Sequence, residues 1–423
     1  MKVVKRDGRV TNFNKEKVRD AVVLAFNEVD GCIDTHARDK ANEIARYIEN
    51  LGKDKLSVEE IQDIVENKLM ASNRKDVAKA YIIYRNNRSK IRDRNTSWMK
   101  TIKEKLAASN VINQNANVDE HSFGGRKGEA DAELLKKIAL DDLMSETSRN
   151  NHLNNEIYVH DLSDYVLGDH NCLTCPVDEL LANGFTVRQT DIRPAQSVGT
   201  AFQLLAVIFQ VQSLQQFGGV SEGHLDWTMV PYVRKSFWKH LRDGIKYINH
   251  ENIDKDVLLY NPEIDDGAID NESAKSYGEE VYQYAIDMTE RETYQAVEGM
   301  YHNLNSLQSR SGNQLPFSSI NYGTCTLPEG RMITKVILEV SIKGIGKLNR
   351  TSIFPCGIFQ YMKGVNDKPG TPNYDLYRLA LKSTALRLYP NYCNVDWSNN
   401  AGYDVNDPRT YMSTMGKRKL QPM

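Results

Sequence analysis

The stretch Val3-Val4-Lys5-Arg6-Asp7-Gly8-Arg9-Val10-Thr11 decides how the first part of the chain folds. Asp-Gly between two short strand-like runs is a strong local signal for a β-hairpin, because a tight turn needs residues that tolerate positive φ. The turn also carries several cations, and Lys and Arg near a helix start are typical of phosphate-binding surfaces. A solvent-exposed charged turn has the same composition, so the stretch predicts a hairpin and leaves its ligand open.

Amphipathic helices are predicted to follow this hairpin. Asn14 is a suitable N-cap, and the apolar residues after it recur with a helical period. A second helix covers about 36–50, and Ser57-Val58-Glu59-Glu60 is a capping box that opens a third helix. A fourth helix runs from about 75 to 92. This pattern predicts a domain of one β-hairpin and four helices over residues 1–95.

The remainder of the chain has a different organisation. Residues 96–129 are polar and rich in Asn, Gly and Ser, so we interpret them as a linker that leads into a barrel. Residues 130–423 alternate helices with strands, which indicates an α/β fold. The strands are predicted at 156–160, 317–322 and 352–360, and the helices at 130–152, 200–217, 277–303 and 331–342.

Composition excludes several classes of protein. The chain has 423 residues, of which 26% are charged and 40% hydrophobic, as is usual for globular domains. Its longest apolar run, Leu204 to Phe209, is much shorter than the ~20 residues of a membrane-spanning helix. The N-terminus lacks a secretory signal, and six cysteines are too few for a disulfide framework. We therefore expect a cytoplasmic protein with no membrane partner.

Charge is unevenly distributed along the chain. Residues 1–95 carry 21 Lys and Arg against 16 Asp and Glu, whereas the whole chain has a net charge of −2. A mildly basic first domain suits a small polyanion, although a solvated helical surface has the same balance. The whole chain lacks the basic character of a nucleic-acid-binding protein, so no nucleic-acid partner is expected.

The segment Asn171-Cys172-Leu173-Thr174-Cys175 contains a Cys-x-x-Cys pair. Such a pair binds a metal, acts as a redox dithiol, or occurs by chance as two buried thiols. The chain has no second Cys-x-x-Cys, so a four-cysteine zinc site is excluded, and we predict no metal site. A redox dithiol would begin a helix after its first cysteine, but here Pro176 follows the second.

Three groups of residues in the first domain form a recognisable series. They are Lys5-Arg6-Asp7-Gly8, then Phe13 with Lys17 and Val18, and finally Tyr81-Ile82-Ile83-Tyr84-Arg85. Residues 3–93 thereby resemble the ATP-cone domain, which implies that ATP or dATP binds here as an allosteric effector. The residues that the resemblance assigns to the nucleotide site are Lys5, Arg6, Asn14, Lys17 and Gln62, with Arg85 and Arg88 near the phosphates.

A longer series of segments follows in the second part. In order they are Ser122 to Glu129, Asn150 to Asn154, Tyr158 to Leu162, His170 to Cys172, Ala182 to Phe185, Arg193 to Ala195, Ser213 to Gly219 and Pro372 to Asp375. From about residue 110 to Gly416 the chain resembles the anaerobic (class III) ribonucleoside-triphosphate reductases, which are glycyl-radical enzymes. The resemblance implies an α/β barrel of ten strands and an oxidoreductase that replaces the ribose 2′-hydroxyl by hydrogen, for deoxyribonucleotide biosynthesis and DNA replication.

The resemblance gives one cysteine a chemical role. In the family a thiyl radical abstracts the 3′-hydrogen, and a second thiol on the first barrel strands donates a hydrogen atom as the 2′-hydroxyl leaves. Cys172 matches that second thiol, and we interpret Cys175 as structural. The implied partners are ribonucleoside triphosphates, a radical-SAM activating enzyme and, in the complete enzyme, a second copy of the chain. The reductant is formate or a thiol protein.

The resemblance ends abruptly after Gly416. The family's thiyl cysteine lies in a Thr-Met-Gly-Cys-Arg segment, whereas this chain has Thr414-Met415-Gly416-Lys417-Arg418. We therefore expect a truncated barrel, with the glycyl radical and the zinc site only in a missing C-terminal part, and no activity from the chain alone. An incomplete barrel is also expected to leave apolar residues from Ile353 to Phe359, and the helix from Thr200 to Phe217, partly uncovered.

A second function stays open at this point. ATP-cones also occur beside a zinc ribbon in a transcriptional repressor of reductase genes. A non-catalytic, nucleotide-sensing regulatory protein is therefore the alternative. The barrel-like segments after residue 110 argue against it.

Overall fold

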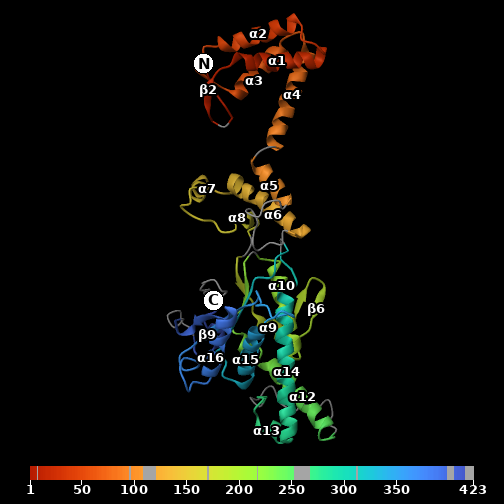
Figure 1. Ribbon diagram of the computed structural model, residues 1–423, viewed down its shortest axis with the longest axis vertical. Helices are drawn as coiled ribbons and strands as arrows, with labels where there is room; N and C mark the ends of the chain where they lie inside the picture. The colour runs from red at the N-terminus through yellow and green to blue at the C-terminus, as the bar shows by residue number, and fades with distance from the viewer. Residues whose placement is uncertain are drawn as a thin grey trace. The chain divides into compact units, whose positions relative to one another are not determined.

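The computed structural model divides the chain into two compact units, Met1–Lys103 and Glu104–Met423 (Figure 1). It describes residues 1–6, 8–94, 97–107, 121–168, 171–216, 218–251, 267–310, 313–397 and 404–414. The division falls inside helix α5 (Ser97–Ala107), later than the boundary at residue 95 that the hairpin and helix pattern indicated. The stretch 96–129, interpreted as a linker, is helical in α5 and again from Phe123 onward. The predicted departure at Lys417 lies outside the described residues.

The first unit combines a small sheet with helices, as predicted. Strand β1 (Lys2–Val4) pairs with β2 (Val10–Asn12) in antiparallel orientation, which confirms the hairpin. It also pairs in parallel with β3 (Lys55–Ser57), a strand that we did not predict because three residues carry no period. The four predicted helices are confirmed as α1 (Lys15–Asp30), α2 (Thr35–Glu49), α3 (Val58–Met70) and α4 (Lys75–Arg94).

Capping interactions explain where these helices begin and end. The Asn14 side chain accepts a hydrogen bond from the Glu16 N–H at 2.9 Å, and Gly31 ends α1 with a φ of 69° that favours glycine. The predicted capping box is present, because Ser57 and Glu60 exchange side-chain to backbone bonds of 3.1 and 2.7 Å. The apolar faces of the helices then form a core that belongs to this unit alone.

The second unit is built on a parallel sheet of five strands in the order β10-β9-β8-β7-β4. The strands are β4 (Leu173–Thr174), β7 (Val220–Glu222), β8 (Ser318–Tyr322), β9 (Cys356–Tyr361) and β10 (Asn391–Asn394). A separate hairpin joins β5 (Phe185–Val187) to β6 (Thr190–Ile192).

The strand predicted at 317–322 is confirmed as β8, and the one predicted at 352–360 begins later, at Cys356. The strand predicted at 156–160 is wrong, because that segment is irregular and the Val159 N–H donates to the His152 ring at 3.2 Å.

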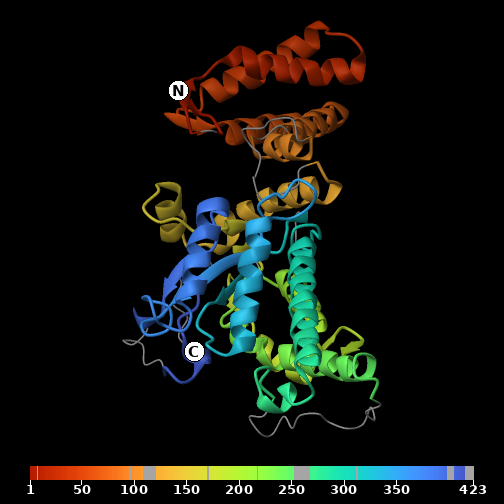
Figure 2. The ribbon, with the colours of Figure 1, turned by 60° about the horizontal axis from the view of Figure 1, so that its bottom comes forward.

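Beyond α5, the described part of the second unit contains eleven α-helices. They are α6 (Phe123–Ile138), α7 (Glu146–Leu153), α8 (Leu162–Tyr165), α9 (Val177–Asn183), α10 (Val198–Ser213), α11 (Leu225–Thr228), α12 (Val230–Tyr247), α13 (Glu272–Lys275), α14 (Glu279–Leu304), α15 (Pro328–Lys343) and α16 (Tyr374–Arg387). The helices predicted near α10, α14 and α15 are confirmed, whereas the one predicted at 130–152 is split by a π-helical turn, Ala139–Leu143. In Figure 2, α14, α15 and α16 lie side by side. No helix in the described residues is long and apolar enough to cross a bilayer.

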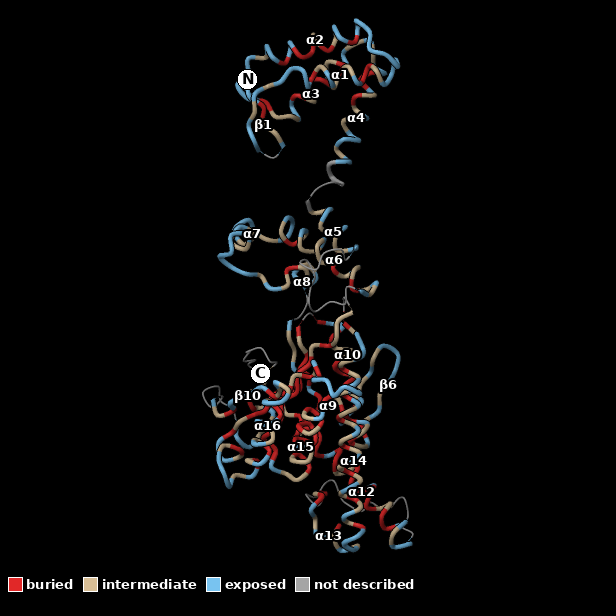
Figure 3. The backbone as a smooth tube through the Cα atoms, in the orientation of Figure 1, coloured by how far each residue is buried: buried red, intermediate tan, exposed pale blue. Residues whose placement is uncertain are grey.

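The two faces of the sheet differ in chemistry. Val220, Ile320 and Phe359 are fully buried on one face, where they pack with α10, α15 and α16 in the main core. In Figure 3, buried segments of the second unit concentrate around α10 and α15. Residues at alternate positions form the opposite face, because register partners in parallel strands point the same way. This opposite face carries Thr174, Ser221, Ser319, Asn321, Cys356, Ile358, Gln360, Asn391 and Cys393. Because Ile358 is the one aliphatic side chain among these nine, we call this side of the sheet the polar face.

Burial tests the predicted lack of cover at both stretches. For the helix at 200–217 the expectation is wrong, because Phe202, Leu205 and Phe209 of α10 have no exposed surface in the main core. The second stretch is 353–359. Ile358 and Phe359 have no exposed surface, so that expectation is wrong for both residues. Ile353, in the irregular segment before β9, is 58% exposed as expected. Phe359 is therefore covered on the apolar face and Ile358 on the polar face, and the exposed residue Ile353 lies before the strand begins.

Because each unit has its own core, we predict two separate thermal transitions. Ile44→Ala and Ile320→Ala each remove a side chain with no exposed surface, one from each core. Each variant is expected to lose ~2–5 kcal/mol of stability, because a cavity remains. In calorimetry, each should lower one transition and leave the other in place. A single transition lowered by both variants would contradict this prediction.

Candidate functional site

Three of the predicted nucleotide-binding residues lie in one ion-pair cluster of the first unit. Arg6 donates to the Gln62 Oε1 at 3.0 Å and pairs with Glu59, which also receives a bond of 3.0 Å from Arg85. The other partners of Arg85 are Asp63 at 2.6 Å and Glu66 at 3.0 Å. The bond from Arg6, followed by the bond from Arg85, holds the pKa of Glu59 below its usual value. Arg6, Gln62 and Arg85 are thus already together, with Glu59 between the two cations.

The other predicted residues have separate surroundings. Asn14 is exposed and caps α1, and Lys17 is exposed on the same helix. The Lys5 N–H donates to the Arg9 carbonyl at 2.8 Å, which closes the hairpin. Arg88 is exposed and donates to the Tyr84 hydroxyl at 3.0 Å. These contacts give Asn14 a structural role in addition to the predicted one.

In the second unit, Cys172 lies at the start of the edge strand β4. The Gly219 N–H donates to the Cys172 Sγ at 3.3 Å, and the thiol donates to the Asn171 Oδ1 at 3.3 Å. The Leu173 N–H donates to the Gly219 carbonyl at 3.1 Å, so the thiol sits where β4 begins to pair with β7. By its position two residues before Thr174, Cys172 belongs to the polar face.

Gly218 fixes how closely the two strand starts approach. A Cβ atom at this position would lie 1.9 Å from the Asn171 carbonyl oxygen, so only glycine fits. The approach brings the Gly219 N–H within reach of the Cys172 sulfur. The Gly-Gly pair that the sequence places after helix α10 is therefore part of the thiol's surroundings.

Cys175 has a different environment from Cys172. It is buried in the main core, on the face opposite the polar face, and its N–H donates to the Ser221 carbonyl at 2.9 Å. Burial raises the pKa of its thiol to about 11, so it stays protonated and unreactive. The two cysteines therefore lie on opposite sides of the sheet, and this arrangement does not suit a redox dithiol.

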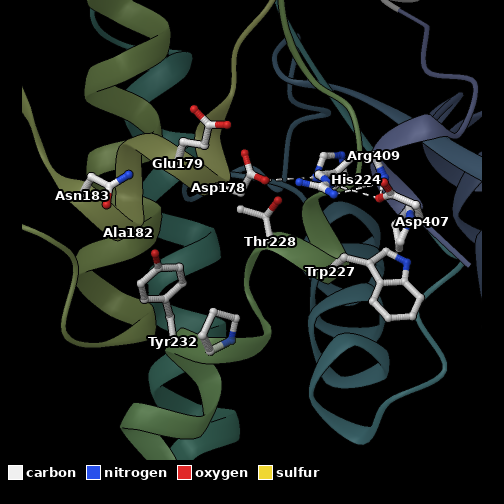
Figure 4. Close-up of a pocket in the computed structure, with 12 residues that line it drawn as sticks. Asp178, Glu179, Ala182, Asn183, His224, Trp227, Thr228, Tyr232, Asp407 and Arg409 are labelled. Carbon is white, nitrogen blue, oxygen red and sulfur yellow. Dashed lines mark hydrogen bonds and ion pairs between the residues drawn. The ribbon is translucent and has the colours of Figure 1, made fainter. Parts of the chain in front are cut away.

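A pocket of about 500 Å³ lies beside the C-terminal ends of β4 and β7 (Figure 4). His224 stands between Asp178, whose Oδ2 lies 3.9 Å from its Nε2, and an ion pair of 3.0 Å between Arg409 and Asp407. Burial lowers the pKa of His224, so the ring is neutral at pH 7. The wall also contains Glu179. Because acidic groups predominate, the pocket is a poor site for a triphosphate.

Glu222, the last residue of β7, lies next to this pocket. It is fully buried, and the Thr228 hydroxyl donates to its Oε1 at 2.8 Å. Burial raises the pKa of Glu222 to about 8, so its carboxyl group is mostly protonated at pH 7. We did not predict this group of Glu222, His224 and Asp178, because the residues come from different elements and form no sequence motif. Within the described residues, no group of three or more His, Cys, Asp or Glu could hold a metal ion.

Comparison with known proteins identifies the family. The profile described as "Anaerobic ribonucleoside-triphosphate reductase" matches residues 114–420, and the profile described as "ATP cone domain" matches residues 1–90. The chain belongs to the anaerobic ribonucleoside-triphosphate reductase family. This result favours a reductase over the regulatory protein that the sequence left open.

Two curated reductases and one solved structure illustrate the similarity. The anaerobic ribonucleoside-triphosphate reductase of Haemophilus influenzae is 29% identical over 93% of this chain and 52% of its own length. The Escherichia coli protein of the same name is 26% identical over 98% of this chain and 57% of its own. The chain therefore spans about half the length of these relatives. The anaerobic ribonucleotide reductase of Thermotoga maritima, solved with dATP and CTP, aligns with a TM-score of 0.44 at 13% identity over 71% of this chain and 47% of that chain.

The stability of this reductase chain should depend on pH through Glu222. Its pKa of about 8 exceeds the ordinary 4.5, so unfolding releases a proton between these values. The free energy of unfolding of the second unit should therefore fall as pH rises through that window, by up to ~1.4 kcal/mol per pH unit. Glu222→Gln is expected to remove this slope, as measured by urea unfolding at several pH values.

Glu179→Gln is the matched control, because Glu179 is exposed on α9. It should keep the slope of the parent. Asp226, whose pKa burial raises to about 6, is present in all three proteins, so the comparison isolates Glu222. An equal slope in the parent and in Glu222→Gln would disprove the assignment.

Proposed function

We propose that this chain supplies the effector-binding domain and the first part of the catalytic barrel of an anaerobic ribonucleoside-triphosphate reductase. The observation that carries the proposal is the place of Cys172, at the start of a parallel strand on the polar face, with its sulfur 3.3 Å from the Gly219 N–H. The five parallel strands correspond to one part of the ten-stranded barrel that the family resemblance implies.

In this proposal Cys172 acts as the hydrogen-atom donor. After the 3′-hydrogen has been abstracted, the 2′-hydroxyl leaves as water with the proton of the 3′-hydroxyl, which gives a 3′-ketone and a radical at C2′. The Cys172 S–H bond then breaks, its hydrogen atom forms the new C2′–H bond, and the unpaired electron remains on sulfur. The Asn171 amide, which accepts from the thiol at 3.3 Å, orients the S–H group. The glycyl radical that initiates the family's chemistry, and its zinc site, are assigned to sequence outside these 423 residues.

The proposed partners follow from the family. Ribonucleoside triphosphates are the substrates, a radical-SAM enzyme is the activator, formate or a thiol protein is the reductant, and the complete enzyme is a homodimer in the cytoplasm. The effector is ATP or dATP. Its proposed site centres on Arg6, Gln62 and Arg85, with Lys5, Lys17 and Arg88 as further cations and Asn14 as a polar contact.

Nucleotide binding tests the first part of the proposal. The Lys5→Ala, Arg6→Ala double variant of the full chain should bind ATP and dATP about 100-fold or more weakly in isothermal titration, because charge-assisted bonds to phosphate contribute ~1.5–3 kcal/mol each. The control is Arg38→Ala, Lys40→Ala on α2, which removes the same charge. Equal affinity of the two double variants, or no binding by the parent, would refute the effector site.

Turnover tests the second part. The chain alone should form no deoxyribonucleotide, even with activating enzyme and formate under anaerobic conditions. When the C-terminal part of a family reductase restores activity, Cys172→Ala should abolish it, because the variant lacks the S–H group proposed as the hydrogen-atom donor. Cys175→Ala, which changes a core thiol, should remain active. Activity in the Cys172→Ala complex would remove this residue from its proposed role.

A further inference from the structure

The segment Tyr411 to Thr414 crosses the polar face without forming a strand. Tyr411 is buried against Met362 and Val395 in a small core of its own, which fixes the start of the segment. Ser413 lies against the backbone of Gly223, because a Cβ built on that glycine would be 3.4 Å from the Ser413 Cβ. The segment therefore runs along the C-terminal ends of the strands, next to the polar face.

Asn321, the penultimate residue of β8, hydrogen-bonds both backbone groups of Thr414, as a neighbouring strand would. Its Oδ1 accepts from the Thr414 N–H at 3.0 Å, and its Nδ2 donates to the Thr414 carbonyl at 3.1 Å. The same Nδ2 lies 2.8 Å from the Glu222 carbonyl on β7. Asn321 has no exposed surface, so its amide links the strand ends directly to the crossing segment.

Gln360 on β9 makes a second link of the same kind. Its Nε2 donates to the Gly223 carbonyl and to the Met412 carbonyl, both at 3.1 Å. These two acceptors fix the orientation of the amide, because reversing it would place its oxygen against two other oxygens. The Oε1 atom is buried and has no hydrogen-bond partner among the described residues.

The unpaired oxygen raises the question of what a glutamine contributes at position 360. A buried carbonyl without a partner is destabilising, and an apolar side chain of similar shape would avoid that cost. Stability alone therefore does not favour Gln360. Gln360 does contact Met412, and Asn321 forms two bonds with Thr414. These contacts indicate that the two amides fix the position of the segment.

We propose that Asn321 and Gln360 are positioning residues that hold 411–414 in one place against the polar face to which Cys172 belongs. The proposal rests on the proposed function for its catalytic meaning, since position 417, where the family resemblance places the thiyl cysteine, follows Thr414 by three residues. The position of 411–414 can be tested by itself, without nucleotide, activating enzyme or turnover.

A disulfide reports the position of the segment. In a Gly223→Cys, Ser413→Cys protein the two Cβ atoms should approach to about the 3.5–4.5 Å that a disulfide requires. Glutathione disulfide should then close this bond readily, as mapped by peptide mass spectrometry. Adding Asn321→Leu or Gln360→Met should slow closure about tenfold or more, because the lost backbone contacts release the segment.

Asn373→Leu is the matched control. Asn373 is equally buried and donates to the Gly323 and Cys325 carbonyls, but its bonds do not involve 411–414. It should leave the closure rate within about twofold while it lowers the melting temperature. Asn321→Asp, which keeps the acceptor for the Thr414 N–H, should recover part of the rate that Asn321→Leu loses.

Two results would overturn the proposal. One is an unchanged closure rate in the folded Gln360→Met protein, which tests the claim even if Asn321→Leu does not fold. The other is an equal loss of rate in Asn373→Leu, which would make the effect a general loss of stability. Because no readout depends on nucleotide reduction, an inactive complex would refute the proposed function and leave this test intact.

Discussion

The backbone groups at the ends of a buried parallel sheet need hydrogen-bond partners, and the second unit depends on meeting this requirement with side chains. The Asp226 carboxylate accepts from the Gly323 and Cys325 N–H groups, both at 2.8 Å. Asn373 donates to the carbonyls of the same two residues at 3.1 and 2.9 Å. The loop after β8 therefore has fixed partners on both sides, and the residues of the polar face are built on that frame.

Local signals in the sequence were sufficient for much of the first unit. The Asp-Gly turn and the Asn14 and Ser57 caps act within a few residues of the groups they satisfy, so their patterns predict structure directly. The polar contacts of the second unit act over much longer separations. Asp226 and Gly323 are 97 residues apart, and neither lies in a recognisable motif. Strands β4 and β7, of two and three residues, are also too short to show a period.

The candidate sites were also only partly predictable from the sequence. Arg6, Gln62 and Arg85 were predicted by family resemblance, and the structure brings them together, but the carboxylate of Glu59 between them had no sequence signal. In the second unit, the Pro372 to Asp375 motif that supported the resemblance proves to be part of the scaffold. Its Asn373 binds the loop after β8, and Asp375 pairs with Arg331 at 2.8 Å. A motif shared with a family can therefore consist of residues that support the structure around a site, and not only of residues that take part in its chemistry.

The polar face carries two further thiols, Cys356 and Cys393, on the same side as Cys172. Burial raises the pKa of both, so each keeps its proton, and a protonated thiol can surrender a hydrogen atom to a nearby carbon radical. In the proposed chemistry such a thiol is a competing quencher. The Cys393 sulfur faces the Met412 carbonyl at 3.6 Å and is almost fully covered. In the proposed chemistry, the segment Tyr411 to Thr414 would shield this spare S–H group from a radical intermediate.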